Sequence, residues 1–284
     1  MPELPEVETV CRSLRPHLDK RTVVRVDVRA PALREPLDGD AMRRAALQRP
    51  IVAVARRAKY LLMRFGPSAG RDATPGGEDA LALHLGMSGR LTLVDGDAPY
   101  APHEHLALHL DDGRRLRLVD PRRFGSAFAL RWTEQAQDRH FAHLGVEPLT
   151  DAFDGPYLAR RAAGRRTAVK TFLMDARIVV GVGNIYASEA LWRAGVHPTR
   201  AAGRIGQARW QRLADAVRAT LDQAITEGGT TLNDFTDGEG NAGYFQVSLA
   251  VYGREGAPCT CCDGTIRRIV QLNRSTFYCP GCQR

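Results

Sequence analysis

Four cysteines near the C-terminal end constrain the fold of this chain more than any other feature. They form two pairs, Cys259-x-x-Cys262 and Cys279-x-x-Cys282, separated by sixteen residues. Pairs at this spacing are typical of a tetrahedral zinc site in which each pair lies on a tight turn and a β-hairpin joins the turns. Because four thiolates leave no open coordination position, we expect one structural Zn2+ that folds a module too small for its own core, with a catalytic zinc as the alternative.

The expected hairpin runs over residues 265–270, turns near residues 273–275 and returns through residues 277–278. This places Arg274 at the tip, away from the metal. Five of the six cysteines fall in the last 26 residues, which points to metal binding and not to a disulfide framework. Cys261 is one residue out of register and could compete as a ligand, although Cys-x-x-Cys fits a metal-binding turn better.

Between Arg21 and Trp132 the sequence alternates short apolar stretches with turns. Such stretches, rich in β-branched and apolar residues, predict strands over 23–28, 51–55, 60–65, 81–84, 90–94, 106–110, 115–119 and 126–131. Many short strands in succession indicate a sandwich or barrel. Ahead of them, apolar residues at helical spacing over 6–18 predict a helix that anchors the N-terminus on the β domain. Residues 66–79, rich in Gly and polar residues, predict a surface loop.

Beyond Thr133 the pattern changes to helices, predicted over residues 157–163, 167–174, 185–194 and 207–227. The last has one apolar face made by Trp210, Leu213, Ala214, Val217, Leu221, Ala224 and Ile225. We therefore predict an α+β multidomain chain: an N-terminal β-sandwich domain (1–132), a linker (133–150), a helical domain (151–243) and a zinc-finger module (244–284).

The charge of the chain favours a polyanionic partner. The formal net charge is +8, and Arg160, Arg161, Arg165, Arg166 and Lys170 fall in one stretch without an acid. An arginine-rich genome is the alternative explanation. The sequence contains no apolar run that would span a bilayer and no signal-peptide pattern, so we expect a cytoplasmic protein without membrane attachment.

The first residues offer a nucleophile beside an acid. Removal of Met1 would leave a secondary amine on Pro2, next to the carboxyl group of Glu3. An α-amino group titrates near pH ~8, so part of it is uncharged at neutral pH and can attack an electrophilic carbon to form an iminium. The alternative is that proline at this position merely permits removal of Met1.

Several turns further along the chain carry side chains suited to DNA. Lys59 stands at the entry to an apolar strand, where lysine suits phosphate binding or acid–base work better than packing. Residues 84–89 (HLGMSG) and 120–125 (DPRRFG) place large side chains on glycine-flanked turns, either as core filling or as a wedge that enters a base stack. Residues 181–184 (GVGN) precede a helix and form either a phosphate site or a simple glycine turn. A nucleotide-cofactor loop of the G-x-G-x-x-G type would need glycine at the position of Tyr186, so we expect no nucleotide cofactor.

Together these segments resemble the bacterial formamidopyrimidine-DNA glycosylase family over nearly the whole chain. Besides the cysteines, the matching motifs are PELPEVE (2–8), RRAKYLL (56–62), HLGMSG, DPRRFG, GVGNIYASE (181–189) and GGTTLNDF (228–235). The resemblance implies a β-sandwich, a helical domain with a helix-two-turn-helix motif and a zinc finger. It also implies a monomeric base-excision-repair enzyme that flips out and removes oxidised purines from duplex DNA and then cleaves the strand by β,δ-elimination.

The resemblance also implies roles for individual residues. Pro2 matches the Schiff-base nucleophile, Glu3 the assisting acid and Lys59 the proton donor of β-elimination. Arg274 matches the finger residue of δ-elimination. The remaining matches are to DNA contacts (His103, Arg122, Arg165 and Asn184), to the side chains that fill the void left by the everted nucleotide (Met87, Arg122 and Phe124), and to damaged-base and phosphate contacts (Glu6 and Lys170). Residues 230–244 match the loop that closes over the flipped base.

Three other functions remain possible at this point. An endonuclease VIII-like enzyme would share the fold and the nucleophile but remove oxidised pyrimidines. A non-catalytic zinc-ribbon protein would bind DNA without using Pro2, and an N-terminal-proline tautomerase would need neither a basic face nor a finger. The longer 66–79 segment and the extra Cys261 depart from the family pattern but do not touch the proposed chemistry.

Overall fold

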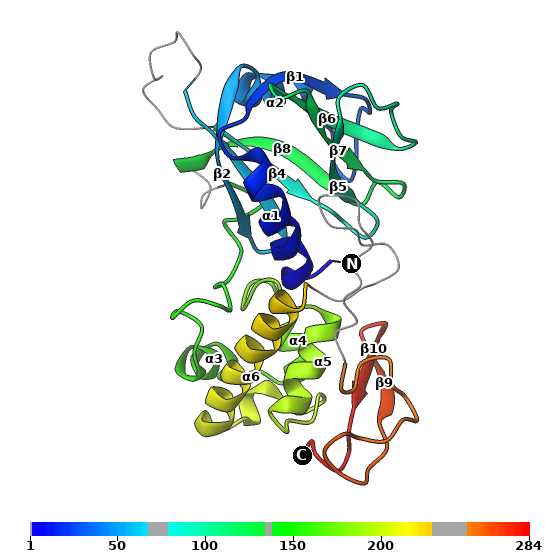
Figure 1. The fold of residues 1–284 in the computed structure, drawn as a ribbon. Coiled ribbons are helices and arrows are strands. Elements are labelled where there is room, and N and C mark those ends of the chain that lie inside the picture. Colours follow the sequence, from blue (N-terminus) through cyan, green and yellow to red (C-terminus); the bar gives the residue numbers. More distant parts are fainter. Residues whose placement is uncertain (1, 68–78, 134–137, 229–248) are drawn as a thin grey trace. The chain divides into compact units, whose positions relative to one another are not determined.

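The computed structural model describes residues 2–67, 79–133, 138–228 and 249–284. The described residues form two compact units, one extending to Ala142 and the other comprising residues 143–227 and 249–284 (Figure 1). We call them unit 1 and unit 2. Within the described part of the chain, no helix is long and apolar enough to cross a membrane. The four-part division predicted from the sequence, with boundaries at 132, 150 and 243, stays a prediction.

Unit 1 contains one eight-stranded antiparallel sheet with the order β5-β7-β6-β1-β2-β3-β4-β8. The strands are β1 (Thr22–Val28), β2 (Arg49–Arg57), β3 (Tyr60–Phe65), β4 (Asp79–His84), β5 (Arg90–Asp95), β6 (Glu104–Leu110), β7 (Arg114–Val119) and β8 (Ser126–Arg131). Every predicted strand is present, and β3 and β8 have the predicted bounds. The strands could be predicted because each is a short apolar run closed by turn residues.

The sheet consists of two four-stranded halves that enclose one core. Only two residue pairs, Thr22↔Pro50 and Val23↔Arg49, join β1 to β2 at the middle of the strand order. Buried residues of both halves, such as Leu108 of β6 and Met63 of β3, belong to the same hydrophobic cluster. The halves therefore pack as the two layers of the predicted sandwich.

Two helices cover this core. α1 (Leu4–Leu18) packs its predicted apolar stripe, from Val7 to Leu18, into the same cluster. α2 (Gly39–Ala46) was not predicted, because eight residues give little periodicity. Its start is fixed by the Asp38 carboxylate, which accepts a hydrogen bond from the Ala41 N–H at 2.9 Å.

Unit 2 begins with the predicted helical region. Its helices are α3 (Gly155–Ala162), α4 (Val169–Leu173), α5 (Asn184–Arg193), the short 3-10 helix η2 (Ala202–Arg204) and α6 (Gln207–Thr226). All seven apolar residues predicted for the inner face of α6 are buried. Periodicity therefore identified both the helix and the face that packs.

A two-stranded hairpin completes unit 2. β9 (Arg267–Gln271) pairs with β10 (Arg274–Tyr278) through a two-residue turn at Leu272 and Asn273, both with positive φ. The turn lies earlier than predicted, and Arg274 opens β10 opposite Gln271 instead of standing at the tip. The signal for this register was Asn273, because asparagine tolerates the left-handed conformation that such a turn requires.

Candidate active site

The start of α1 holds the predicted nucleophile and acid in a fixed position. Pro2 is half-buried, and Glu3 is the N-cap residue with only 4% of its surface exposed. Glu6 Oε2 accepts a hydrogen bond from the Glu3 N–H at 2.7 Å, as part of a capping box. Glu6 is 2% exposed, so its carboxylate holds the Pro2–Glu3 start in place. Its predicted contact with a damaged base stays a prediction.

The same helix is tied to the turn that carries Lys59. Glu8 of α1 accepts a hydrogen bond from Arg56 at 3.0 Å, and Arg56 Nη1 donates to the Ala58 carbonyl at 2.9 Å. Ala58 has φ of 54° and turns the chain from β2 into β3, so that half-buried Lys59 follows directly. The side chain of Lys59 therefore stands on a turn whose position is set by the first half of α1.

The positive charge of Lys59 also affects the protonation of His84, which lies in the same part of unit 1. Burial, followed by the charges of Lys59 and Arg34, lowers the pKa of His84 to about 4. A neutral imidazole is what the geometry requires, because His84 Nδ1 accepts a hydrogen bond from the Gly86 N–H at 2.9 Å. His84 is therefore uncharged at neutral pH and shapes the turn that carries Met87.

All three predicted wedge side chains, Met87, Arg122 and Phe124, project from the surface. Met87 is 41% exposed and Phe124 is 46% exposed, which excludes the alternative that they fill the core. Arg122 places its guanidinium 4.6 Å from the centre of the Phe124 ring, a cation–π contact on the same turn. His103 is likewise exposed on a turn, with φ of 62°.

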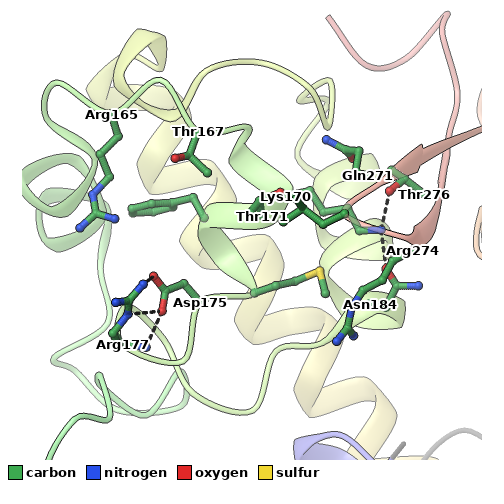
Figure 2. A pocket seen from close by; sticks show the side chains of 13 residues that line it. Arg165, Thr167, Lys170, Thr171, Asp175, Arg177, Asn184, Gln271, Arg274 and Thr276 are labelled. Carbon is green, nitrogen blue, oxygen red and sulfur yellow. Dashed lines mark hydrogen bonds and ion pairs between the residues drawn. The ribbon is translucent and has the colours of Figure 1, made fainter.

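Unit 2 contains a pocket of about 380 Å³ between its helices and the hairpin (Figure 2). It is lined by Arg165, Thr167, Lys170, Thr171, Phe172, Met174, Asp175, Arg177, Asn184, Gln271, Leu272, Arg274 and Thr276. Arg165 and Arg274 are exposed, whereas Arg177 is engaged by the Asp175 carboxylate at 2.9 Å. The pocket carries more cations than acids and suits a phosphate.

Lys170 lies at the back of this pocket and is 2% exposed. Its Nζ donates to Asn184 Oδ1 at 2.6 Å and to Thr276 Oγ1 at 2.8 Å (Figure 2), and also to the Ser275 carbonyl at 3.2 Å. An ammonium group has three donors, so these bonds join α4, α5 and β10 and use all of them. The predicted direct contact of Lys170 with DNA stays a prediction, and the structure gives the residue a positioning role.

Asn184 is the first residue of α5, and its side chain is held as firmly. Its oxygen accepts from Lys170, while its amide nitrogen donates to the Ser275 carbonyl at 3.0 Å and to the Tyr252 hydroxyl at 3.3 Å. The helix begins at Asn184, one residue earlier than the predicted start at residue 185, and Gly183 is its N-cap. The amide therefore fixes the strand that begins with Arg274.

The four paired cysteines form one cluster. Sγ atoms are 3.7 Å apart for Cys259–Cys282, 3.4 Å for Cys262–Cys279 and 3.5 Å for Cys262–Cys282, and all four lie within 4.8 Å of one another. A disulfide needs about 2.05 Å, whereas tetrahedral coordination with metal–sulfur bonds of ~2.3 Å gives sulfur–sulfur edges of about 3.8 Å. The geometry thus suits one metal ion, and Cys261, which is exposed, stands outside the cluster.

Comparisons with known proteins agree with this architecture. The sequence model of the formamidopyrimidine-DNA glycosylase N-terminal domain matches residues 1–127, and that of its H2TH domain matches residues 144–236. The chain is 53% identical over 285 residues to the formamidopyrimidine-DNA glycosylase of Halorhodospira halophila and 52% identical over 292 residues to that of Alkalilimnicola ehrlichii, with 100% of each chain covered. The chain belongs to the formamidopyrimidine-DNA glycosylase family.

Solved structures of this family match the whole fold. The MutM protein of Thermus thermophilus is 38% identical with a TM-score of 0.83, covering 99% of this chain and 98% of the other. A Lactococcus lactis member bound to abasic-site DNA is 28% identical with a TM-score of 0.87 and 99% of each chain covered. Residues 230–244, for which the sequence predicts a base-capping loop, and most of the 66–79 segment lie outside the described residues.

The structure adds two residues of this family member to those predicted from motifs. Glu189 is 7% exposed, and its carboxylate accepts the N–H groups of Ala250, Val251 and Tyr252 at 2.8–3.0 Å, where the chain enters the cysteine-bearing segment. The sequence feature that could have identified Glu189 is a carboxylate within an otherwise apolar stretch of α5. The second residue is Asp120, which is completely buried. Its sequence signal was an aspartate directly before the proline of a turn.

Proposed function

We propose that this chain is a bifunctional DNA glycosylase and AP lyase of base-excision repair that removes 8-oxoguanine and formamidopyrimidines from duplex DNA. The observation that carries the proposal is the capped start of α1, which holds Pro2 beside a buried Glu3. A flexible terminus would spend most of its time away from any substrate, whereas this one is pre-positioned. Family membership agrees with the proposal.

Pro2 is the nucleophile of the proposed reaction, once Met1 has been removed. Its nitrogen forms a bond to C1′ of the extruded nucleotide as the bond from C1′ to the damaged base breaks. The base leaves with that electron pair and takes up a proton, while Glu3 protonates the ring oxygen to open the sugar. General acid–base steps of this kind supply about 10²- to 10⁴-fold each, a supporting contribution to a covalent route.

Strand cleavage follows from the same covalent intermediate. The iminium between Pro2 and C1′ makes the C2′ proton acidic, so its loss expels the 3′ phosphate, and a second elimination expels the 5′ phosphate. We assign Lys59 to proton transfer in the first elimination and Arg274 to the second. Hydrolysis of the iminium then frees Pro2 for the next turnover.

DNA binding is assigned to both units. In unit 1, His103 and Arg122 contact the backbone, and Met87, Arg122 and Phe124 fill the place of the extruded nucleotide, offsetting a few kcal/mol of lost stacking. In unit 2, Arg165, Arg274 and the backbone N–H of Asn184 at the start of α5 serve a phosphate in the pocket of Figure 2. Lys170 acts behind them by orienting Asn184.

We infer that the cysteine cluster holds one structural Zn2+ through Cys259, Cys262, Cys279 and Cys282. When bound, the ion supplies folding free energy to a segment with a small core of its own. We also propose that the protein acts as a monomer without a nucleotide cofactor, in the bacterial cytoplasm and at the nucleoid when bound to DNA. The net charge of +8 suits that partner.

Oxidised pyrimidines are the second candidate substrate class. One Lactococcus lactis structure, 28% identical to this chain, contains an oxidised-pyrimidine DNA, and others contain Fapy-dG DNA. We place purines first because the matched motifs are those of the formamidopyrimidine enzyme.

Single-turnover scission of duplexes carrying one 8-oxoguanine, one formamidopyrimidine or one oxidised pyrimidine tests the proposal. We expect the purine lesions to be processed fastest, Pro2→Gly to lose scission, and Glu3→Gln to be slowed by about 10²-fold or more. Asp40→Asn, which changes an exposed acid at the start of another helix, is the matched control and should be unchanged. Binding without scission by the unmodified chain would favour a non-catalytic DNA-binding protein, and full activity of Pro2→Gly would exclude the nucleophile.

A further inference from the structure

Two surface turns of unit 1 cross between the halves of its sheet. Residues 85–89 lead from β4 to β5, and residues 120–125 lead from β7 to β8. β4 pairs with β8, and β5 pairs with β7, along their whole lengths. Each of the two turns therefore connects the β4–β8 pair to the β5–β7 pair, and the two turns lie at the same end of these pairs. The side chains assigned to the void in the DNA stand on these two turns.

Asp120 joins the two turns through its carboxylate. Its Oδ1 accepts a hydrogen bond from the Ser88 hydroxyl at 2.6 Å, and its Oδ2 accepts one from the Gly125 N–H at 2.8 Å. The Ser88 oxygen in turn accepts the Arg122 N–H at 3.2 Å. Asp120 is 0% exposed, so these charge-assisted bonds form away from competing water.

The backbone of Asp120 extends the connection to a third turn. Its N–H donates to the His103 carbonyl at 3.0 Å, and its own carbonyl lies 2.9 Å from His105 Nε2. One buried residue therefore touches every turn of unit 1 to which we assign a DNA contact.

The two crossing turns also pack backbone against backbone. Gly86 has φ of +62°, and a Cβ placed on it would lie 2.4 Å from the Phe124 carbonyl carbon. A Cβ on Gly125 would lie 2.5 Å from the His84 carbonyl oxygen. Only glycine allows this contact, which sits next to Met87 on one turn and next to Phe124 on the other.

Stability alone does not account for this arrangement. Met87 and Phe124 are 41% and 46% exposed, so fixing their separation contributes little to the hydrophobic core. A rigid pair of turns does matter for a wedge, because side chains that enter a base stack lose less conformational freedom when they are already positioned.

We infer that Asp120 is a positioning residue that makes the two turns a single preformed wedge for nucleotide extrusion. The inference rests on the proposed function, since a wedge matters only if a nucleotide leaves the stack. Asp120 touches no substrate in this account. It acts through Met87, Arg122 and Phe124.

Asp120→Ala, compared with the unmodified full-length protein, tests the inference in three measurements on one set of duplexes. 2-Aminopurine next to an 8-oxoguanine reports unstacking, single-turnover scission reports excision, and scission of a preformed abasic site reports the later steps. We expect unstacking and excision to slow about tenfold or more, while abasic-site cleavage changes less than about threefold, because an abasic nucleotide is cheaper to extrude. Asp112→Ala removes a carboxylate from the β6–β7 turn and is the matched control, expected to be unchanged.

Ser88→Ala keeps the test decisive if Asp120→Ala fails to fold. It removes one of the two carboxylate bonds from a half-buried position and should slow unstacking about threefold while the protein stays folded, with a lower free energy of unfolding. Folded variants that unstack DNA at the normal rate, or that lose excision and abasic-site cleavage equally, would overturn the inference. Absence of excision by the unmodified chain would instead refute the proposed function, so the two failures are distinguishable.

Discussion

Replacing Glu189 with alanine should weaken the attachment of the cysteine-bearing segment to α5. The change leaves three N–H groups without their acceptor, and the Val251 N–H is buried while Ala250 and Tyr252 are half-buried. A buried unsatisfied donor costs about 1–3 kcal/mol, and the two that water can reach cost less. The expected loss is about 2–4 kcal/mol in the free energy of opening this segment.

Glu189→Gln should cost less. Its single oxygen can keep the bonds of Oε1 to Val251 and Tyr252, so the loss is limited to the Ala250 bond, about 1 kcal/mol. Glu255→Gln changes an exposed carboxylate of the same segment, 3.8 Å from Arg268, and should have almost no effect.

The assay is the rate of zinc transfer to a chromogenic chelator. The change in tryptophan fluorescence is a second probe, because the indole of Trp192, one of three in the chain, packs against the core that surrounds the cysteines. If transfer requires opening of the segment, a loss of about 2 kcal/mol predicts an increase of about 30-fold for Glu189→Ala. Equal rates for Glu189→Ala and Glu255→Gln would refute the reasoning, as would a larger effect of glutamine than of alanine.

Three further predictions concern the metal, the acid stability and Lys59. Cys279→Ser should release zinc and abolish damaged-DNA binding while unit 1 stays folded, whereas Cys261→Ser should keep one zinc by metal analysis; zinc loss in the latter would refute the ligand assignment. Burial and the charges of Lys59 and Arg34 lower the pKa of His84 to about 4, so the folded state resists its protonation, and the unfolding free energy should fall by about 3 kcal/mol as pH drops from 6.5 to 4. His84→Gln should flatten that part of the urea-unfolding profile, and an unchanged slope would contradict the assignment. Lys59→Ala should slow lesion processing more than it weakens binding; equal losses, with a salt slope smaller by about one, would identify a simple phosphate contact.

Local sequence patterns predicted the elements of this fold well. Apolar runs closed by turn residues located all eight strands, and the apolar face of α6 identified its buried side. The strand order could not be predicted in this way, because the pairing of β5 with β7 depends on contacts that leave no local periodicity. α2 was not predicted because its eight residues span only about two helical turns, too few to establish a periodicity, although Asp38 is a recognisable N-cap.

The residues of the candidate site likewise fall into those that the sequence predicts and those that only the structure reveals. Motifs singled out Pro2, Lys59 and the cysteine pairs, because each combines a reactive residue type with a recognisable local context. The motifs could not reveal that all three N–H donors of Lys170 bond to groups inside the protein, since its partner Thr276 is 106 residues away in sequence. Residues that act by holding others, such as Asp120 and Glu189, become visible only when the contacts are known.

Covalent trapping with borohydride tests the central claim most directly. Incubation with an 8-oxoguanine duplex and borohydride should reduce the iminium and leave the protein attached to DNA, and peptide mass analysis should place the sugar fragment on the nitrogen of Pro2 in a chain that lacks Met1. Strand scission without an adduct, or an adduct on the side chain of Lys59, would contradict the account.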